Sequence, residues 1–289
     1  MTATIRSWIS ERVAVCCARV FQSLQSATVR TSGETAMRFQ DQGVIITGAG
    51  SGIGRETAIE FAQEGAVVAC TDIDSDTAGR TVEEIEKRGG RAHAFTLDTT
   101  DPKAVKTVFA AAAERMSRMD VLINSAGVRE IEPVVDLPYE EWCRVINVNL
   151  TGVFLCSQAF VRKLTSEGTS GSIVNLASTL GLTAAPNRPA YTASKHAVVG
   201  LTKEMGLELG ESGIRVNAVG PGVTRTALTE RYFQNPDMAD TVKSIHAMNR
   251  WGEAREIARV ILFLASEDAS FMTGVTVPID GGWLAGKKM

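Results

Sequence analysis

Short apolar runs alternate with longer segments of helical spacing along most of the chain. Seven such runs, rich in Val, Ile and Thr, predict strands at 43–47, 66–71, 91–97, 120–125, 171–178, 214–219 and 275–279. Between them, apolar residues recur at steps of three and four, which predicts helices at 53–64, 76–88, 102–117, 138–166, 189–211 and 253–266. This alternation predicts an α/β fold with a doubly wound, mainly parallel seven-stranded sheet and helices on both faces.

One long stretch breaks the alternation. Residues 220–252 follow neither period and hold several residues that interrupt regular structure: Gly220, Pro221, Gly222, Pro236 and Gly252. Long loops inside a compact domain are usually functional, so we expect a substrate lid at about 225–250. No linker or internal repeat divides the chain further, and residues 39–289 are expected to form a single domain.

The first 38 residues differ from the rest of the chain. They hold five arginines and two glutamates but no lysine, aspartate or proline, and their apolar residues follow helical spacing. This composition is typical of a mitochondrial transit peptide. The simpler interpretation of residues 1–38 is a disordered extension, or a translation start that belongs at Met37. We therefore expect a cytoplasmic protein, with the mitochondrial matrix as the alternative if this segment is a targeting leader.

Composition narrows the class of protein. The 289 residues carry 30 basic and 33 acidic side chains, a formal charge of −3, and 44% are apolar. This near balance argues against nucleic acid as a partner, because phosphate binding requires a concentrated basic surface. No stretch approaches the roughly 18 unbroken apolar residues of a spanning helix, so we expect no membrane partner. The five cysteines lack metal-ligand spacing, which predicts reduced thiols and indicates no metal site.

A glycine-rich turn follows the first predicted strand. The sequence TGAGSGIG, residues 47–54, runs directly into a helical pattern. Glycines allow left-handed backbone and let a diphosphate approach the amides at a helix start. Strand, turn and helix in this order predict a dinucleotide site, and a glycine-rich turn without a ligand is the alternative.

The second predicted strand ends at an acidic residue. Asp72 lies 18 residues beyond Gly54, near the spacing expected of a carboxylate that binds the adenosine ribose. Such a carboxylate accepts hydrogen bonds from the ribose hydroxyls and repels a 2′-phosphate, which favours NAD over NADP by roughly two decades or more. Capping of the next helix by Asp72 is the alternative, and Asp74 competes for the ribose role.

Tyr191 and Lys195 form the most specific pair in the sequence. They lie at positions i and i+4 of a predicted helix, so the ammonium can sit beside the phenol. An adjacent cation favours the phenolate and lowers the pKa of a tyrosine, which is about 10 when free. Ser178, thirteen residues upstream at the end of a strand, can donate a hydrogen bond to a substrate oxygen.

These features together resemble the single-domain branch of the short-chain dehydrogenase/reductase family. The resemblance spans about residues 43–282 and rests on TGAGSGIG (47–54), Asp98, NSAG (124–127), VNL with Asn149, Ser178, YTASK (191–195), PGVTRT (221–226) and DGG (280–282). It implies a Rossmann fold and a NAD(P)-dependent oxidoreductase. The family commonly has Asn where this chain has Ser125, a departure that affects one structural hydrogen bond at most.

The resemblance also implies a role for each catalytic residue. Tyr191 would be the general acid/base, and Lys195 would lower its pKa and hold the ribose of the nicotinamide half. Ser178 would orient the substrate oxygen. Asn149 would hold a water that links Lys195 to solvent, although a cap or bridge within its own helix is the alternative.

The same resemblance implies a set of cofactor contacts along the expected cleft. Its members are Gly48, Ser51, Gly52, Ile53, Gly54, Asp72, Ile73, Asp98, Thr99, Asn124, Ala126, Gly127, Tyr191, Lys195, Pro221, Gly222, Thr224 and Thr226. Family members that prefer NADP often carry a basic residue where Ser51 or Ile73 stands, so the resemblance also favours NAD.

We therefore expect an oxidoreductase that interconverts a secondary alcohol and a ketone by hydride transfer with NAD. An NADPH-dependent carbonyl or 3-oxoacyl reductase is the alternative within this class. A nucleotide sensor without catalysis is a rival from another class, although a sensor would not need all four catalytic residues.

The sequence does not identify the substrate. Its pocket is expected to include Val128, Arg129, Glu130, Thr179, Leu180 and Leu182, with an apolar lid face from Tyr232, Phe233 and Met248. Three arginines are candidates for an anionic substrate group, with plain surface charge as the simpler interpretation: Arg129, Arg188 and Arg225. Of the histidines His93, His196 and His246, only His246 is expected near the substrate.

Two predicted helices, 138–166 and 189–211, carry more apolar residues than one sheet face needs. The excess comprises Val153, Phe154, Leu155, Phe160, Ala197, Val198, Val199 and Leu201. The family commonly forms tetramers by pairing these two helices, so the resemblance implies a homotetramer.

Overall fold

The computed structural model describes residues 37–286. The expected extension at 1–38 therefore lies almost wholly outside the described residues. Near the predicted boundary, Arg38 pairs with Glu64 at 2.8 Å and Phe39 is fully buried. The compact unit accordingly begins at Met37.

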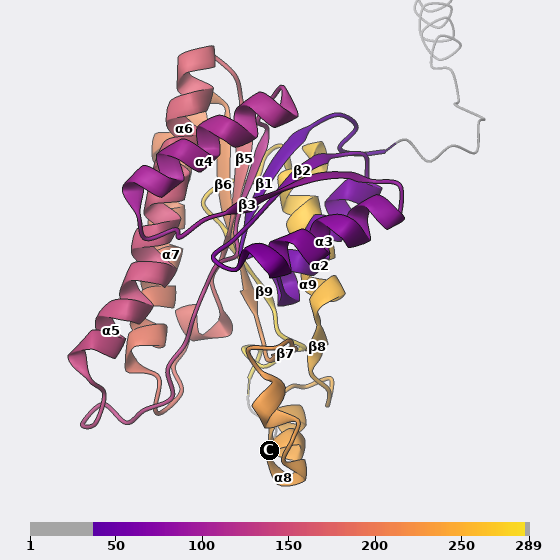
Figure 1. Ribbon diagram of the computed structural model, residues 1–289. Coiled ribbons are helices and arrows are strands. Elements are labelled where there is room, and N and C mark those ends of the chain that lie inside the picture. Colours follow the sequence, from indigo (N-terminus) through magenta and orange to yellow (C-terminus); the bar gives the residue numbers. More distant parts are fainter. Residues whose placement is uncertain (1–36, 287–289) are drawn as a thin grey trace, which may run out of the picture. The chain divides into compact units, whose positions relative to one another are not determined.

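Seven parallel strands form the central sheet, in the order β3-β2-β1-β4-β5-β6-β9 (Figure 1). Their bounds are β1 (Gly43–Thr47), β2 (Val67–Asp72), β3 (Arg91–Thr96), β4 (Val121–Asn124), β5 (Gly171–Leu176), β6 (Ile214–Pro221) and β9 (Thr276–Ile279). All seven predicted strands are confirmed, and each pairing in this sheet is parallel. From β1 the chain adds β2 and β3 towards one edge of the sheet, and it then returns to add β4 and the later strands towards the other edge. The switch point between β1 and β4 is where open α/β sheets bind ligands.

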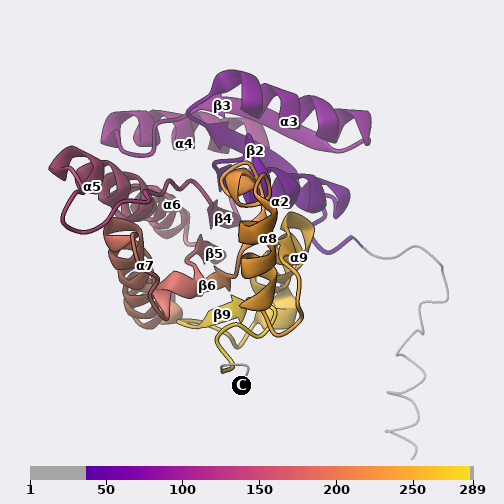
Figure 2. The same cartoon turned by 90° about the horizontal axis from the view of Figure 1, so that it is seen from below.

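Helices cover both faces of the sheet, as predicted (Figure 2). One face carries α2 (Gly52–Gln63), α3 (Ser75–Lys87) and α9 (Ala254–Ala265), and the other carries α4 (Pro102–Met116), α6 (Gly152–Glu167) and α7 (Pro189–Glu208). Successive residues of β1 enter the two cores in turn. Val44 and Ile46 pack on the side of α2 and α9, whereas Ile45 packs on the side of α4 and α6. This period of two is the pattern from which the strand was predicted.

The helix predicted at 138–166 contains an interruption. α5 (Tyr139–Ile146) continues into a π-helical segment, Asn147–Thr151, before α6 begins. Asn149 lies in the middle of this segment and is fully buried. Single π-helical turns inside an α-helix often mark functional positions, and apolar spacing alone did not predict this one.

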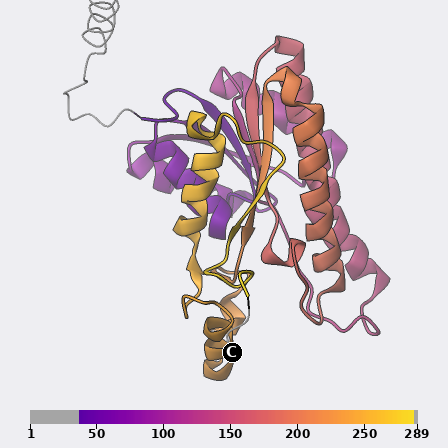
Figure 3. The ribbon, with the colours of Figure 1, turned by 180° about the vertical axis from the view of Figure 1, so that it is seen from behind.

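The stretch at 220–252 is more regular than we expected. β7 (Thr224–Arg225) pairs with β8 (Gly252–Glu253), and between them lies α8 (Pro236–Ser244). The Asn235 side chain caps α8 by accepting hydrogen bonds from the backbone amides of Asp237 and Met238, and Pro236 occupies the first turn. The prediction of an irregular stretch was therefore wrong, since Asn-Pro-Asp is a helix start. Figure 1 labels β7, β8 and α8 at one end of the sheet, and Figure 3 shows the orange helix α8 there from behind.

Candidate active site

The glycine-rich turn joins β1 to α2 with backbone that other residues would strain. Gly48 and Gly52 have φ values of +67° and +54°, and a Cβ on Gly54 would lie 2.2 Å from the Gly48 carbonyl oxygen. The N-cap residue of α2, Ser51, makes no side-chain capping bond, so the amides of the first turn are not satisfied by it. A helix start of this kind, opening on a cleft, fits a diphosphate.

Asp72 lies at the end of β2, facing the same turn. Its Oδ2 accepts a hydrogen bond from the Gly50 amide at 2.9 Å, and its Oδ1 accepts one from the Asp74 amide at 3.1 Å. The cap of α3 is Asp74 instead, whose Oδ1 accepts from Asp76 and Thr77. The structure thus separates the two acidic residues, leaving Asp72 in the cleft and Asp74 at the helix.

A cavity of about 350 Å³ runs along the carboxyl edge of the sheet. Every residue predicted to contact the cofactor lines this cavity except Asn124. Ser178, Val128 and Ser125 also line it, as do residues for which the sequence predicted no individual role: Leu97, Val148, Leu176, Ala177, Leu228 and Thr229. Val148 directly precedes Asn149, and Leu228 and Thr229 belong to the predicted lid. Their closeness in sequence to these predicted segments was the one feature from which a place in the cavity wall could have been predicted.

Asn124 faces the protein interior and not the cavity. Its Nδ2 donates to the Asn175 side chain at 2.8 Å and to the Ser157 hydroxyl at 3.0 Å, and the residue is 2% exposed. The structure therefore does not bring this side chain to the cofactor cleft, and a contact between Asn124 and the cofactor stays a prediction. Asn124 instead connects β4 to β5 and α6 beneath the site.

Tyr191 and Lys195 come from the first turns of α7 and line the cavity with Ser178. Burial raises the pKa of the Tyr191 phenol, while the Ser178 hydroxyl and the Arg129 guanidinium oppose that shift. The Ser178 oxygen accepts a hydrogen bond from the Leu180 amide at 3.1 Å, which leaves its own proton free to be donated.

Lys195 is a buried cation with a single hydrogen bond from its ammonium. Its Nζ donates to the Leu176 carbonyl oxygen at 2.6 Å and lies 5.6 Å from the centre of the Tyr191 ring. Burial lowers the pKa of Lys195 to about 8. Arg129 and Arg188 are the cations that lower the pKa of the Tyr191 phenol, and no pattern in the sequence indicated either of them in this role.

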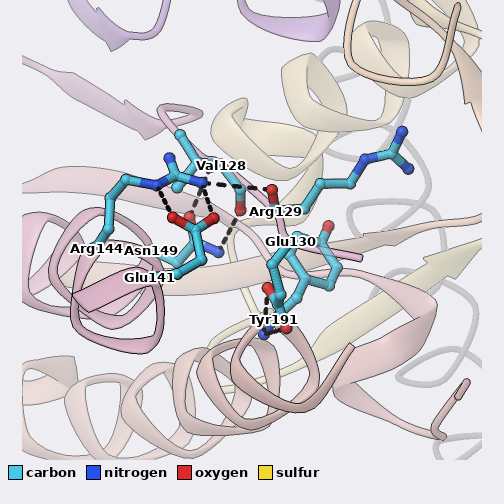
Figure 4. Close-up of polar contacts among 7 residues, drawn as sticks. All are labelled: Val128, Arg129, Glu130, Glu141, Arg144, Asn149 and Tyr191. Carbon is cyan, nitrogen blue, oxygen red and sulfur yellow. Dashed lines mark hydrogen bonds and ion pairs between the residues drawn. The ribbon is translucent and has the colours of Figure 1, made fainter. Parts of the chain in front are cut away.

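The segment that follows the NSAG turn is tied down from two sides (Figure 4). Asn149 accepts a hydrogen bond from the Val128 amide and donates to the Val128 carbonyl, both at 2.8 Å, and it also donates to Ser194 of α7 at 3.1 Å. Asn149 therefore bridges between elements and not within its own helix. Its expected role in holding a water stays a prediction.

Glu130 holds the backbone of the catalytic tyrosine. Both of its carboxylate oxygens accept from the Tyr191 amide, at 3.0 and 3.1 Å, and the residue is 4% exposed (Figure 4). A carboxylate at this point also satisfies the amide end of α7, where negative charge is favourable. The sequence predicts Glu130 only as part of the substrate pocket. Its bond to the Tyr191 amide, 61 positions away, could not be predicted from a local pattern.

His246 does not reach the cavity that holds Tyr191. Its Nδ1 lies 2.7 Å from the Val242 carbonyl oxygen, its Nε2 accepts from the Val223 amide at 3.3 Å, and it is 1% exposed. The ring also packs edge-on against Trp283, with centroids 5.7 Å apart. The expectation that His246 meets the substrate was wrong, because its side chain joins α8 to the residues before β7.

Most of the other residues expected near the substrate lie around the cavity and not on its wall. Thr179 and Leu180 are buried behind Ser178, and Leu182 and Met248 are largely exposed. Tyr232 is buried in the lid, while Phe233 packs against Trp251 with centroids 4.7 Å apart. Within residues 37–286, no group of three or more His, Cys, Asp or Glu side chains is arranged to hold a metal ion.

Comparison with known proteins places this site in a family. Residues 48–284 match a family model described as enoyl-(acyl carrier protein) reductase. A 3-oxoacyl-[acyl-carrier-protein] reductase of Thermotoga maritima is 41% identical, covering 85% of this chain and 99% of that protein. A cyclohexanol dehydrogenase of an Acinetobacter strain is 39% identical, covering 85% of this chain and 96% of that protein.

Solved structures agree with these relatives. A 4-hydroxyisoleucine dehydrogenase complexed with NADH is 38% identical with a TM-score of 0.79, covering 85% of this chain and all of that chain (100%). A crystal structure from Agrobacterium tumefaciens with bound NADP is 34% identical with a TM-score of 0.81, covering 88% of this chain and 100% of that one.

Lys195→Met is expected to stabilise the fold at pH 7. The unfolded chain binds the lysine proton with a pKa near 10.5 and the folded chain with one of about 8, a difference worth about 3 kcal/mol. Below pH 8 the buried ammonium lowers the free energy of unfolding by this full amount. The loss disappears above pH 10.5, because between these two pH values only the unfolded chain holds the proton. Urea unfolding at pH 7 and at pH 10 measures the effect.

The control for this experiment is Lys203→Met, which removes an exposed ammonium from the same helix. It is expected to change the free energy of unfolding by less than about 0.5 kcal/mol at either pH. A Lys195→Met protein no more stable than the parent at pH 7, or equally stabilised at both pH values, would contradict the prediction.

Proposed function

The chain belongs to the short-chain dehydrogenase/reductase family, and on this premise we propose that it interconverts a secondary alcohol and a ketone with NAD. The observation that carries the proposal is that Tyr191, Lys195 and Ser178 share one cavity with the glycine-rich turn. NAD, when bound there, would accept or return the hydride. The alcohol and ketone enzymes among the relatives support this assignment.

The chain's own residues would handle the proton and the orientation of the substrate. In the oxidation, the Tyr191 phenolate takes the hydroxyl proton, and in the reduction the phenol returns it to the carbonyl oxygen. Ser178 donates its free proton to the same oxygen, which positions the carbon. Proton transfer by a positioned group typically contributes about 10²–10⁴-fold to the rate.

The choice of NAD over NADP rests on Asp72. Its carboxylate lines the cavity beside Ile73 at the end of β2, where a 2′-phosphate would place like charges in contact. Gly50 holds this carboxylate in place, and a Cβ there would lie 2.8 Å from Oδ2. The alternative remains an NADPH-dependent carbonyl or 3-oxoacyl reductase.

We also propose that the protein is a homotetramer paired through α6 and α7. α5, η1 (Asn147–Thr151) and α6 run as one long, largely apolar helix, Tyr139–Glu167, which is only partly buried within this chain. Such a helix passes the length and composition test for a membrane span, as core helices of other folds also do. Several of the expected contact residues pack inside this chain instead: Val153, Phe160, Val198 and Val199.

Phe154 and Leu207 are 45% and 86% exposed, and these are the apolar side chains that pairing of α6 and α7 would cover. Light scattering at micromolar concentration should give the mass of four chains, and a monomer mass would overturn this part of the proposal. Cytoplasmic localisation, with the matrix as its alternative, stays a prediction that cell fractionation would decide.

Asp72 is expected to set the preference between NADH and NADPH. NADH is expected to bind about 10²-fold more tightly than NADPH, and Asp72→Asn should narrow that ratio by removing the repulsion of the 2′-phosphate. Fluorescence titration of the parent protein and of Asp72→Asn with each nucleotide measures this ratio of affinities. Asp76→Asn on α3 is the control, and it should leave the ratio unchanged. Equal or tighter binding of NADPH to the parent would move the reductase alternative to first place.

A second prediction concerns the proton. Tyr191→Phe should reduce the turnover number by about 10²-fold or more while the NADH dissociation constant stays within a few-fold. Tyr139→Phe is the matched control, because that phenol is 74% exposed and lies on α5 outside the cavity. Turnover retained in Tyr191→Phe would refute the assignment of the general acid/base.

A further inference from the structure

Two arginines from different parts of the chain converge on one phenol beside the cavity. Arg129 donates from Nη1 to the Tyr232 hydroxyl oxygen at 2.9 Å and from Nη2 to the Leu228 carbonyl. Arg188 donates from Nη2 to the same Tyr232 oxygen and from Nη1 to the Pro186 carbonyl at 2.8 Å. All the acceptors that hold these two guanidinium groups are therefore neutral.

The cavity of about 760 Å³ that contains Arg129 and Arg231 is also lined by carboxylates, but none of them forms an ion pair with these arginines within residues 37–286: Glu130, Glu132, Asp136 and Glu141. None of the ion pairs there involves Arg129, Arg188 or Arg231, whose guanidinium lies 5.8 Å from the Tyr232 ring. The nearby Glu130 carboxylate is engaged by the Tyr191 amide. Burial lowers the pKa of Arg129, Arg231 and Arg188 lower it further, and Tyr232 and Tyr191 oppose that shift.

The groups at this point are also rich in donors. A guanidinium has five N–H groups and a phenol has one O–H, so the two arginines and Tyr232 offer many more protons than the three neutral acceptors use. Tyr232 is 8% exposed and its ring lies 4.7 Å from the Arg129 guanidinium carbon, so the cluster is packed and not splayed into solvent. A carboxylate or phosphate would supply the charged acceptors that the hydrogen bonds of these two guanidinium groups lack.

The cluster lies next to the reacting position. Arg129 follows Val128, which lines the cavity, and Arg188 precedes Tyr191 by three residues. Figure 4 shows Arg129 and the Tyr191 ring on the same side of the segment at 128–130. Leu228, whose carbonyl Arg129 holds, lines both the main cavity and a neighbouring one of about 760 Å³ that contains Arg129 and Arg231.

We propose that the substrate is a secondary alcohol or ketone that carries an anionic group, a carboxylate or a phosphate, bound by Arg129 and Arg188. The inference rests on the proposed function for the reacting carbon, and the anion site itself stands on the arginine geometry. Of the three arginines that the sequence offers as candidates for an anionic substrate group, this geometry selects Arg129 and Arg188. Arg225 is exposed and stacks on Phe233 at 5.6 Å, so it serves as the control.

Binding tests the anion site without any need for turnover. Calorimetry would compare cyclohexanecarboxylate and cyclohexyl phosphate with the neutral cyclohexanecarboxamide on the NADH-loaded protein. At least one anion should bind about tenfold or more tightly than the amide, since hydrogen bonds to charged groups are stronger than neutral ones. Tighter carboxylate binding assigns a hydroxy or oxo acid, and tighter phosphate binding assigns a phosphorylated substrate.

Variants then locate the site. Arg129→Met/Arg188→Met should lose the preference for the anion, Arg129→Lys/Arg188→Lys should recover part of it, and Arg225→Met should keep it. Circular dichroism confirms that each variant is folded. Equal binding of amide and anions by the parent, or an unchanged preference in the double methionine variant, would overturn the inference.

Kinetics separates this inference from the proposed function. The parent should oxidise 4-hydroxycyclohexanecarboxylate with a kcat/KM about tenfold or more above that of its methyl ester, and the double methionine variant should reduce that ratio towards one. Turnover of both compounds at equal kcat/KM refutes the anion site alone. Anion binding without turnover of any alcohol or ketone, with either nucleotide, refutes the proposed function alone.

Discussion

The placement of a buried ammonium beside a buried phenol is the constraint on which the site depends. Lys195 is buried without a carboxylate partner, and its ammonium donates a hydrogen bond to the Leu176 carbonyl oxygen at 2.6 Å. Burial of an unpaired cation opposes folding, so the surrounding structure must supply the stability that this residue removes. The two apolar cores on either face of the sheet, centred on Ile46 and Ile45, supply it.

Keeping the phenol in register requires fixing the start of α7 from outside the helix. Glu130 binds the Tyr191 amide, and Asn149 holds the neighbouring Val128 through both of its backbone groups. The π-helical turn at Asn147–Thr151 carries Asn149, which also bonds to Ser194 of α7. Three elements distant in sequence are thus joined by polar bonds that each satisfy a buried group.

The same segment links the reacting centre to the lid. Arg129 leaves the chain between Val128 and Glu130, and it holds the Leu228 carbonyl and the Tyr232 hydroxyl of the lid. Arg129, together with Arg188, therefore contributes both to the position of the lid and to the charge near Tyr191. An anionic group that engaged Arg129 would therefore bind the side chain that also holds the lid.

The sequence by itself determined the layers and most of the cleft, because hydrophobic period and glycine-rich turns are local properties of the chain. Strand β1, helix α2 and residues such as Asp72 and Tyr191 lie where those patterns predict. Only the tertiary structure decided that Asn124 and His246 face away from the cavity, that Glu130 anchors Tyr191, and that Arg129 meets Arg188. Those outcomes depend on partners 23 to 103 positions away along the chain, and no local pattern specifies which distant groups a side chain will meet.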